Sequence, residues 1–389
     1  MRIPALRIAA PLLAAVAIGQ PAFADDTPEP YRVPGKVIQI LKAFDNPEGA
    51  IFSPDGRYVY ISNAAELGNP EKGFHWTEKA GYVSKLAVKA DGTLSMVSEK
   101  LVDGLTAPLG MAISTAATKR FPKGTIFLCA GAAPIAEADG THIGDPSRAK
   151  PRMVAFNAAG KILGEIDMGA GSAFEKITGA VATLPNAADF DAEGNLYVAD
   201  TGIAGAAFDP PVKTAPGVWK IPKASLDLLA DGKDAPLQFI AMPEGGPDGL
   251  QIAPDGSIHT NTVGAAAGMK DPAAGGMYRL TVQDFEKGSL PAPFASNLGA
   301  LDGLDFVGGV RLDTEIVKTN TVVVTIPFGK PQTLVLDPEH KFAGPADVAV
   351  RKQADGSWLL VVPELSATLP NNKDNAVTVI RLPADFERR

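Results

Sequence analysis

Acidic and amide side chains recur at one position of a sequence pattern that the chain repeats six times. Near the start of each copy, in chain order, stand Glu48, Leu109, Asn186, Asp248, Asp302 and Ala346, and Asp347 follows the last. Three carboxylates and an amide gathered around one axis would be repulsive without a cation, and a hard divalent ion prefers oxygen ligands of this kind. If the copies bring these residues together, the sequence predicts a divalent metal site.

A simpler interpretation is that each acid only caps a turn. Asp and Asn beside Pro or Gly commonly accept hydrogen bonds from nearby backbone groups. This interpretation suits any single residue, whereas recurrence at equivalent positions favours a shared site.

The repeated pattern itself indicates the fold. NPEGAIFSPDGRYVYISNA, LPNAADFDAEGNLYVADTG and GPDGLQIAPDGSIHTNTVG each contain a short apolar strand, a tight turn and a second strand. The copies begin at Asn46, Ala107, Leu184, Gly246, Leu301 and Gly344. A spacing of roughly 45 to 75 residues, with four strands available per copy, is typical of β-propeller blades. We expect an all-β, six-bladed β-propeller. In the fifth copy, TVVVTIPFG is the expected second strand and VRLDTEIVKTN an interruption.

The two ends of the chain are expected to meet in one blade. The sixth copy ends after AVTVIRLP and is one strand short, while GKVIQILKAF (35–44) has no partner in the first copy. Pairing of Val37–Leu41 beside Val377–Leu382 would complete the last blade and leave no open edge.

Long insertions follow the second strand of five copies, at 64–81, 132–151, 203–216, 265–275 and 367–375. In an antiparallel blade this connection lies on the same face as the start of the first strand. One face of the propeller should therefore carry the long loops, and the recurring acids should lie at the centre of that face. His75, His142 and Arg148 fall in these insertions and are candidate substrate contacts. For the histidines, packing at the surface or in the core is the alternative.

The first 24 residues carry two arginines, an apolar run and an Ala22-Phe23-Ala24 ending, which predicts a secretory signal peptide cleaved after Ala24. Residues 25–34 form a leader, 35–384 one propeller, and 385–389 a tail. Removal of the signal lowers the net charge from −8 to about −10. This balance argues against nucleic acid and anionic membranes as partners. A periplasmic or secreted location follows. Cys129, the only cysteine, is expected in the core.

Motifs of several common hydrolases are missing from the sequence. There is no HExxH, no Gly-x-Ser-x-Gly and no phosphate-binding loop. Zincin, serine-hydrolase and nucleotide chemistry therefore have no motif here.

PEGAIFSPDGRYVYIS, PNAADFDAEGNLYVADT and PDGLQIAPDGSI resemble first-strand motifs of the regucalcin, gluconolactonase and luciferin-regenerating-enzyme family of six-bladed propellers. The resemblance implies that Glu48, Asn186 and Asp248 hold the metal and that Asp248 is also the suspected base. Leu109 departs from the family, because it offers no polar group where a sugar-binding Asn would stand. This departure argues against a sugar lactone as the substrate.

Together these features predict a metal-dependent hydrolase of lactones or related esters, acting on a small-molecule substrate. The cation would polarise the carbonyl, and Asp248 or Asp302 would activate water. Calcium is the favoured ion, with zinc, magnesium and manganese as alternatives. The competing prediction is a non-catalytic propeller, similar to NHL or strictosidine-synthase-like proteins, that binds a protein or small ligand on its loop-bearing face.

Overall fold

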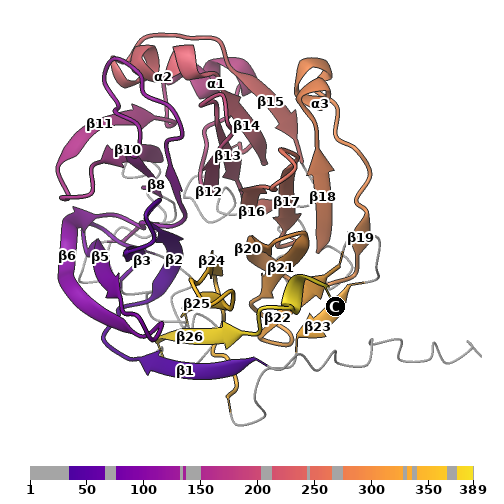
Figure 1. Cartoon of the computed structure of the whole chain (residues 1–389). Coiled ribbons are helices and arrows are strands. Elements are labelled where there is room, and N and C mark those ends of the chain that lie inside the picture. The colour runs from indigo at the N-terminus through magenta and orange to yellow at the C-terminus, as the bar shows by residue number, and fades with distance from the viewer. Residues whose placement is uncertain are drawn as a thin grey trace, which may run out of the picture.

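Six four-stranded antiparallel sheets are arranged around a central axis in the computed structural model of the chain (Figure 1). The structure describes residues 35–65, 76–131, 135–136, 150–202, 213–242, 246–264, 275–326, 331–334, 340–365 and 375–388. The innermost strands of neighbouring sheets contact one another all the way round the ring. The predicted six-bladed β-propeller is therefore confirmed.

The blades are numbered in chain order, and the strands of each run from the centre to the rim. Blade one contains β2 (Pro47–Phe52), β3 (Tyr58–Asn63), β5 (Gly81–Val88) and β6 (Leu94–Leu105). Blade two contains β7 (Met111–Ile113), β8 (Ile126–Ala130), β10 (Arg152–Phe156) and β11 (Ile162–Asp167). Blade three contains β12 (Pro185–Phe190), β13 (Leu196–Asp200), β14 (Gly217–Ile221) and β15 (Gln238–Ala241).

The other three blades follow the same plan. Blade four contains β16 (Pro247–Ile252), β17 (Ile258–Thr262), β18 (Gly276–Leu280) and β19 (Ala295–Ser296). Blade five contains β20 (Leu301–Val307), β21 (Val310–Glu315), β22 (Thr321–Thr325) and β23 (Gln332–Leu334). Blade six contains β24 (Ala349–Lys352), β25 (Trp358–Glu364), β26 (Ala376–Leu382) and β1 (Lys36–Leu41).

The N-terminal strand completes blade six, as predicted. β1 pairs antiparallel with β26, with Val37 opposite Ile380 and Leu41 opposite Val377 (Figure 1). The Gln39 side chain also exchanges two hydrogen bonds with the backbone of Leu94 in blade one, at 2.7 and 3.0 Å. The closing strand is thus bonded to both blades that meet at the junction.

The expected second strand of blade five was wrong. Val310–Glu315, interpreted from the sequence as an interruption, forms β21, and the TVVVT segment is the third strand, β22. β21 was missed because it contains Arg311 and Asp313 at positions where the other second strands carry apolar residues, except for Thr260 of blade four at the position of Asp313.

Most of the apolar core lies in the seams, meaning the packed interfaces between neighbouring blades. Large buried clusters fill the seams between blades one and two, two and three, three and four, five and six, and six and one. Between the strands of blades four and five, the apolar cluster of the described residues has only Met277, Leu301 and Val323 as buried members. This seam is polar instead.

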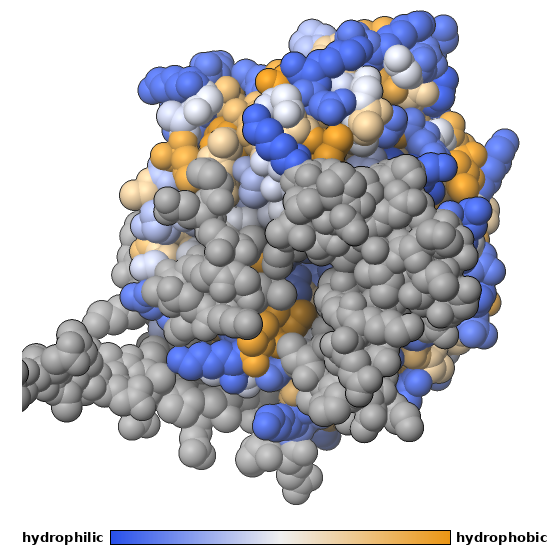
Figure 2. Space-filling model, turned by 180° about the vertical axis from the view of Figure 1, so that it is seen from behind, coloured by the Kyte–Doolittle hydropathy of each residue, from blue (hydrophilic) through white to orange (hydrophobic). Residues whose placement is uncertain are grey.

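Short helices and one small extra sheet connect the blades. α1 (Ala173–Thr178), α2 (Lys223–Ala230), α3 (Val282–Lys287) and the 3-10 turn η6 (Phe386–Arg388) lie between or after outer strands, and α2 packs on β11. β4 (Trp76–Thr77) pairs in parallel with β9 (Ile135–Ala136), linking the insertions of blades one and two. None of the helices in the described residues has the length and apolar character needed to cross a membrane. On the face seen in Figure 2, hydrophobic residues are scattered among hydrophilic ones over the upper, described rim.

Candidate functional site

The innermost strands surround a channel of about 240 Å³ along the propeller axis. Glu48, Asn186, Asp248 and Asp302 all line it, so the structure brings together the four oxygen-bearing residues selected from the sequence. They come from β2, β12, β16 and β20, in blades one, three, four and five. Blades one and four lie opposite each other in the ring.

A local irregularity of the inner strands orients these side chains. In β2 the pairing register with the second strand shifts between Pro47 and Ala50, which is where Glu48 lies. The same shift flanks Asn186, Asp248 and Asp302 in the other three strands. Bulges of this kind turn a side chain away from the regular alternation of a strand. Here they occur where each candidate residue meets the channel.

Small residues after the acids allow the inner strands to approach closely. A Cβ on Gly49 would come within 2.7 Å of the Leu109 carbonyl oxygen, and one on Gly249 within 2.3 Å of the Asp302 carbonyl oxygen. Both contacts are too short for any side chain. Glycine at these positions keeps the blades close enough for the acids to share one channel.

The channel carboxylates are buried and repel one another. Glu48, Asp248 and Asp302 are only 4 to 7% exposed. Burial raises the pKa of all three well above the usual range, and neighbouring charge adds to it: Asp248 and Asp347 act on Glu48, and Asp347 acts on Asp248. The pKa of Asp302 is raised by burial, then by Asp248, Glu48 and Asp347. No Lys, Arg or His is among the described residues that line the channel.

The channel offers oxygen donors of the kind that a hard divalent cation prefers. Asp248 Oδ1 is buried and has no hydrogen-bond partner in the described structure, and Asn186 adds an amide oxygen in the same channel. Buried oxygen donors with excess negative charge fit such an ion in type. Within the described residues, however, no three His, Cys, Asp or Glu side chains form a metal-binding group by themselves. A site here would need Asn186 as well as the acids.

Three further aspartates, in inner strands or just before one, were not selected as site residues from the sequence. Asp347 Oδ2 accepts a hydrogen bond from Ala50 N at 2.9 Å, and Asp305 Oδ2 accepts one from Val350 N at 2.6 Å. Asp189 Oδ2 likewise accepts from Ile252 N of the next blade. Each carboxylate therefore joins its inner strand to the next one around the ring.

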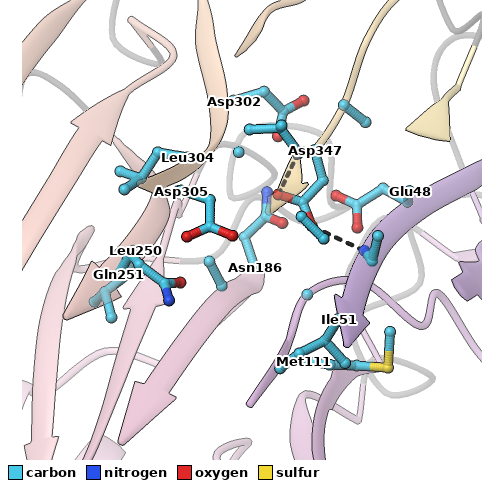
Figure 3. Close-up of a pocket in the computed structure, with 18 of the residues that line it drawn as sticks. Glu48, Ile51, Met111, Asn186, Leu250, Gln251, Asp302, Leu304, Asp305 and Asp347 are labelled. Carbon is cyan, nitrogen blue, oxygen red and sulfur yellow. Dashed lines mark hydrogen bonds between the residues drawn. The ribbon is translucent and has the colours of Figure 1, made fainter. Parts of the chain in front are cut away.

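These three aspartates also have raised pKa values. Burial is the main cause, and it raises the pKa of Asp189 and of Asp347 to about 6 and that of Asp305 to about 8. Around one space of the channel lie the carboxyl groups of Glu48, Asp305 and Asp347 and the amide of Asn186 (Figure 3). The sequence did contain a signal for two of these aspartates: Asp189 and Asp305 both stand at the fifth residue of the first strand of their blade.

Leu109 and Ala346 bring no polar side chain to the channel. Leu109 is 1% exposed and packs in the apolar cluster between blades two and three, together with Cys129, which is buried as expected. Ala346 lines the channel without a polar side chain. His75, His142 and Arg148 lie outside the described residues.

Several solved structures share the fold. A gluconolactonase from Xanthomonas campestris matches with a TM-score of 0.53 at 15% identity, covering 90% of this chain and 95% of its own. A protein of unknown function from Dyadobacter fermentans matches with a TM-score of 0.54 at 11% identity, covering 90% and 99%. A luciferin-regenerating enzyme matches with a TM-score of 0.50 at 13% identity, covering 88% and 94%.

No protein-family model matches the chain, and no curated protein matches it in sequence. At these identities the structural matches establish the fold alone. The resemblance to six-bladed propellers of the gluconolactonase and luciferin-regenerating group is confirmed at that level.

Proposed function

We propose that the protein is a metal-dependent hydrolase of lactones or related esters, acting in the central channel. The observation that carries this proposal is the buried group of carboxylates in the channel, with no Lys, Arg or His among the described residues that line it. One carboxylate oxygen of this group, Asp248 Oδ1, has no hydrogen-bond partner in the described structure. Such an arrangement is costly unless a cation or bound protons compensate the charge. The gluconolactonase named among the similar folds supports the choice of reaction.

Glu48, Asn186 and Asp248 would hold the metal through their side-chain oxygens, and calcium suits them best. When bound, a divalent cation of this kind polarises a substrate carbonyl and stabilises charge that develops on its oxygen. The chain's own residues supply the rest. Glu48 and Asp248 come from opposite blades, so the substrate carbonyl would be directed toward the axis between them.

Asp302 is the proposed general base, and Asp248 is the alternative. Its pKa is raised by burial and by the acids around it, which makes its carboxylate a stronger base than that of an exposed aspartate. Its carboxylate would take a proton from water as the water oxygen bonds to the carbonyl carbon. The ring carbon–oxygen bond then breaks, and that proton passes to the ring oxygen, which becomes the hydroxyl of the hydroxy acid product. The new carboxylic acid loses its remaining proton to solvent.

The charge of the channel also selects among substrates. Five acids and no basic side chain line it in the described residues. A neutral lactone or ester can enter without repulsion, whereas the carboxylate product is repelled. We therefore expect uncharged substrates to be hydrolysed in preference to those bearing a carboxylate or phosphate.

The test begins with metal analysis of purified protein, followed by a panel of neutral and anionic lactones and esters. Hydrolysis of neutral members, lost with a chelator and restored by calcium, is the expected result. Glu48→Gln should weaken calcium binding, and Asp255→Asn in an exposed turn serves as the control. Metal-free protein that binds no divalent ion and hydrolyses nothing would overturn the proposal and favour a ligand-binding propeller.

Export is part of the proposal and rests on the sequence of residues 1–24. The chain expressed in a Gram-negative host should accumulate in the periplasm. N-terminal sequencing of that material should begin at Asp25. Cytoplasmic protein that retains Met1 would contradict export.

A further inference from the structure

In the part of the chain that the structure describes, the seam between blades four and five contains a buried ion pair, whereas large apolar clusters fill the other five seams. Arg311 and Asp313 of β21 are 3% and 0% exposed and face blade four. According to the strand register, the residues equivalent to Arg311 in the other five blades are Val59, Ile126, Leu196, Ile258 and Leu360. Replacing such a pair by apolar residues is often neutral or stabilising. The pair is therefore not explained by stability alone.

All five N–H groups of Arg311 find acceptors in this seam. Two bonds, of 2.8 and 2.6 Å, reach the two oxygens of Asp313. The others reach His259 Nδ1 at 3.2 Å and the carbonyl oxygens of Thr260 and Tyr278. Because Arg311 can only donate, His259 Nδ1 accepts, and the ring proton lies on Nε2. This neutral histidine donates to Ser257 Oγ and so cannot activate it as a nucleophile.

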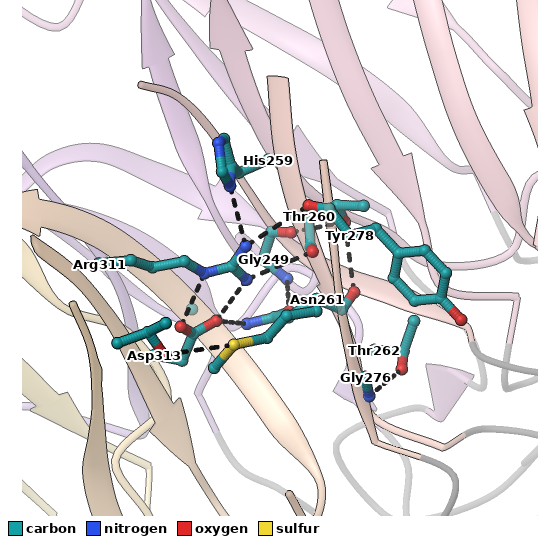
Figure 4. Close-up of polar contacts among 12 residues, drawn as sticks. Gly249, His259, Thr260, Asn261, Thr262, Gly276, Tyr278, Arg311 and Asp313 are labelled. Carbon is teal, nitrogen blue, oxygen red and sulfur yellow. Dashed lines mark hydrogen bonds and ion pairs between the residues drawn. The ribbon is translucent and has the colours of Figure 1, made fainter. Parts of the chain in front are cut away.

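The network continues from the ion pair to the channel. Asp313 Oδ1 accepts a hydrogen bond from Asn261 Nδ2 at 2.9 Å, which fixes the orientation of that amide. Asn261 Oδ1 then accepts from Gly249 N at 2.8 Å, and Thr260 Oγ1 donates to the carbonyl oxygen of Gly249. Figure 4 shows this continuous path from Arg311 to Gly249. Gly249 directly follows Asp248.

Blade one has a simpler version of the same contact. Ser62, which occupies the position equivalent to Asn261, accepts a hydrogen bond from Gly49 N at 2.7 Å, and Gly49 follows Glu48. In blades two and five the corresponding glycine N–H instead donates to a backbone carbonyl of the next blade. A side chain therefore holds the backbone at the two blades that carry the proposed carboxylate ligands of the metal.

We propose that Asn261, oriented by Asp313 and Arg311, is a positioning residue that fixes the bulge of β16 and hence the direction of the Asp248 carboxylate. This inference rests on the proposed function, since it explains how one metal-binding carboxylate is held. Asn261 is not among the described residues that line the channel. It acts through Gly249, and Ser62 acts on Glu48 in the same way.

The test compares two variants that differ by one oxygen. Asn261→Ala removes the acceptor for Gly249 N. Asn261→Ser instead offers a hydroxyl as the acceptor, as Ser62 does for Gly49 N at the equivalent position of blade one. Both lose the bond to Asp313 and should lose similar thermal stability. We expect calcium affinity to fall at least about tenfold in Asn261→Ala and to stay within about threefold of the wild type in Asn261→Ser. Thr378→Val, a buried hydroxyl of blade six away from the channel, is the control for general destabilisation.

Amide hydrogen exchange gives a second readout that needs no metal. In metal-free protein, peptides covering Gly249 should exchange faster in Asn261→Ala than in Asn261→Ser or the wild type. Equal exchange and equal calcium affinity in the two Asn261 variants would overturn the positioning role. If the wild type bound no calcium, the proposed function would fail, and the exchange experiment would still decide whether Asn261 holds the backbone beside Asp248.

Discussion

The central channel and the seam between blades four and five both bury charged groups, but they balance that charge differently. In the seam, Arg311 satisfies both oxygens of Asp313 and every donor has an acceptor. In the channel, Glu48, Asp248 and Asp302 repel one another, and Asp248 Oδ1 has no partner in the described structure. Burial of charge therefore does not identify a functional site. Incomplete compensation does, because it leaves a requirement that a ligand can meet.

The largest effect is expected from breaking the compensation in the seam. Arg311→Met should lower the free energy of unfolding by about 3–5 kcal/mol, because it leaves the Asp313 carboxylate buried without a partner. Urea denaturation of the metal-free protein measures this change.

The matched variant combines Arg311→Leu with Asp313→Val, which copies the pair Leu196 and Val198 at the equivalent positions of blade three. It should recover most of the lost stability, since both charges are gone. Equal loss in the single and the double variant would show that the ion pair is not what the seam depends on.

The next effect is on turnover and concerns the uncompensated group. Asp302→Asn should reduce hydrolysis at least about 10²-fold, because the amide cannot accept a proton from water. Its calcium affinity should change much less than that of Asp248→Asn, which loses the charge of a proposed ligand. Steady-state kinetics and calorimetric calcium titration of both variants give the comparison. If Asp302→Asn retains turnover while Asp248→Asn abolishes it, Asp248 is the base.

A smaller effect is expected from filling the channel with calcium. An ion that binds only the folded state stabilises it by about 2.7 kcal/mol when its free concentration is a hundredfold above Kd. Thermal melting should shift upward with calcium in the wild type and in Asp255→Asn, and little in Glu48→Gln. An upward shift of the same size in Glu48→Gln would place the calcium outside the channel.

The same contrast explains which parts of the fold the sequence predicted. The blades were recognised because their second strands repeat an apolar alternation, and the closing strand because GKVIQILKAF had no other partner. Blade five was misassigned where Arg311 and Asp313 break that alternation, since a buried pair that satisfies itself is indistinguishable from a polar loop in sequence. Such pairing depends on contacts between blades, which a single sequence does not display.

The candidate site was predicted in the part that repeats. Glu48, Asn186, Asp248 and Asp302 share one position in successive copies, and the channel brings them together. Asp347 and Asp305 were not selected, because the first lies one residue out of phase and the second lies at the fifth position of its strand. Their importance follows from hydrogen bonds to the next blade, which appear only once the ring is closed.

The smallest effect separates the two regions by pH. Burial raises the pKa of Asp305 to about 8, with Asp347 and Asp189 adding to the shift, while burial and then Arg311 and Arg279 lower the pKa of His259 to about 3. A carboxyl with a raised folded-state pKa stabilises the fold when protonated, so its contribution declines between about pH 4 and 8. A histidine with a lowered pKa contributes stability above about pH 6.5, which is lost as the pH falls toward 3.

Between pH 6.5 and 8 the channel acids should act together with Asp200, whose pKa burial raises to about 7, while His259 stays neutral. The metal-free protein should therefore lose stability as the pH rises, by about 1 kcal/mol per pH unit. Asp305→Asn should flatten this slope, because its side chain does not titrate, although it still offers an acceptor to Val350 N. Calcium should oppose the slope in the wild type by compensating the channel charge. Urea denaturation across this pH range measures all three. A slope unchanged by Asp305→Asn would mean that Asp305 is not the source of the pH dependence, and that other buried acids, such as Asp200, resist ionisation instead.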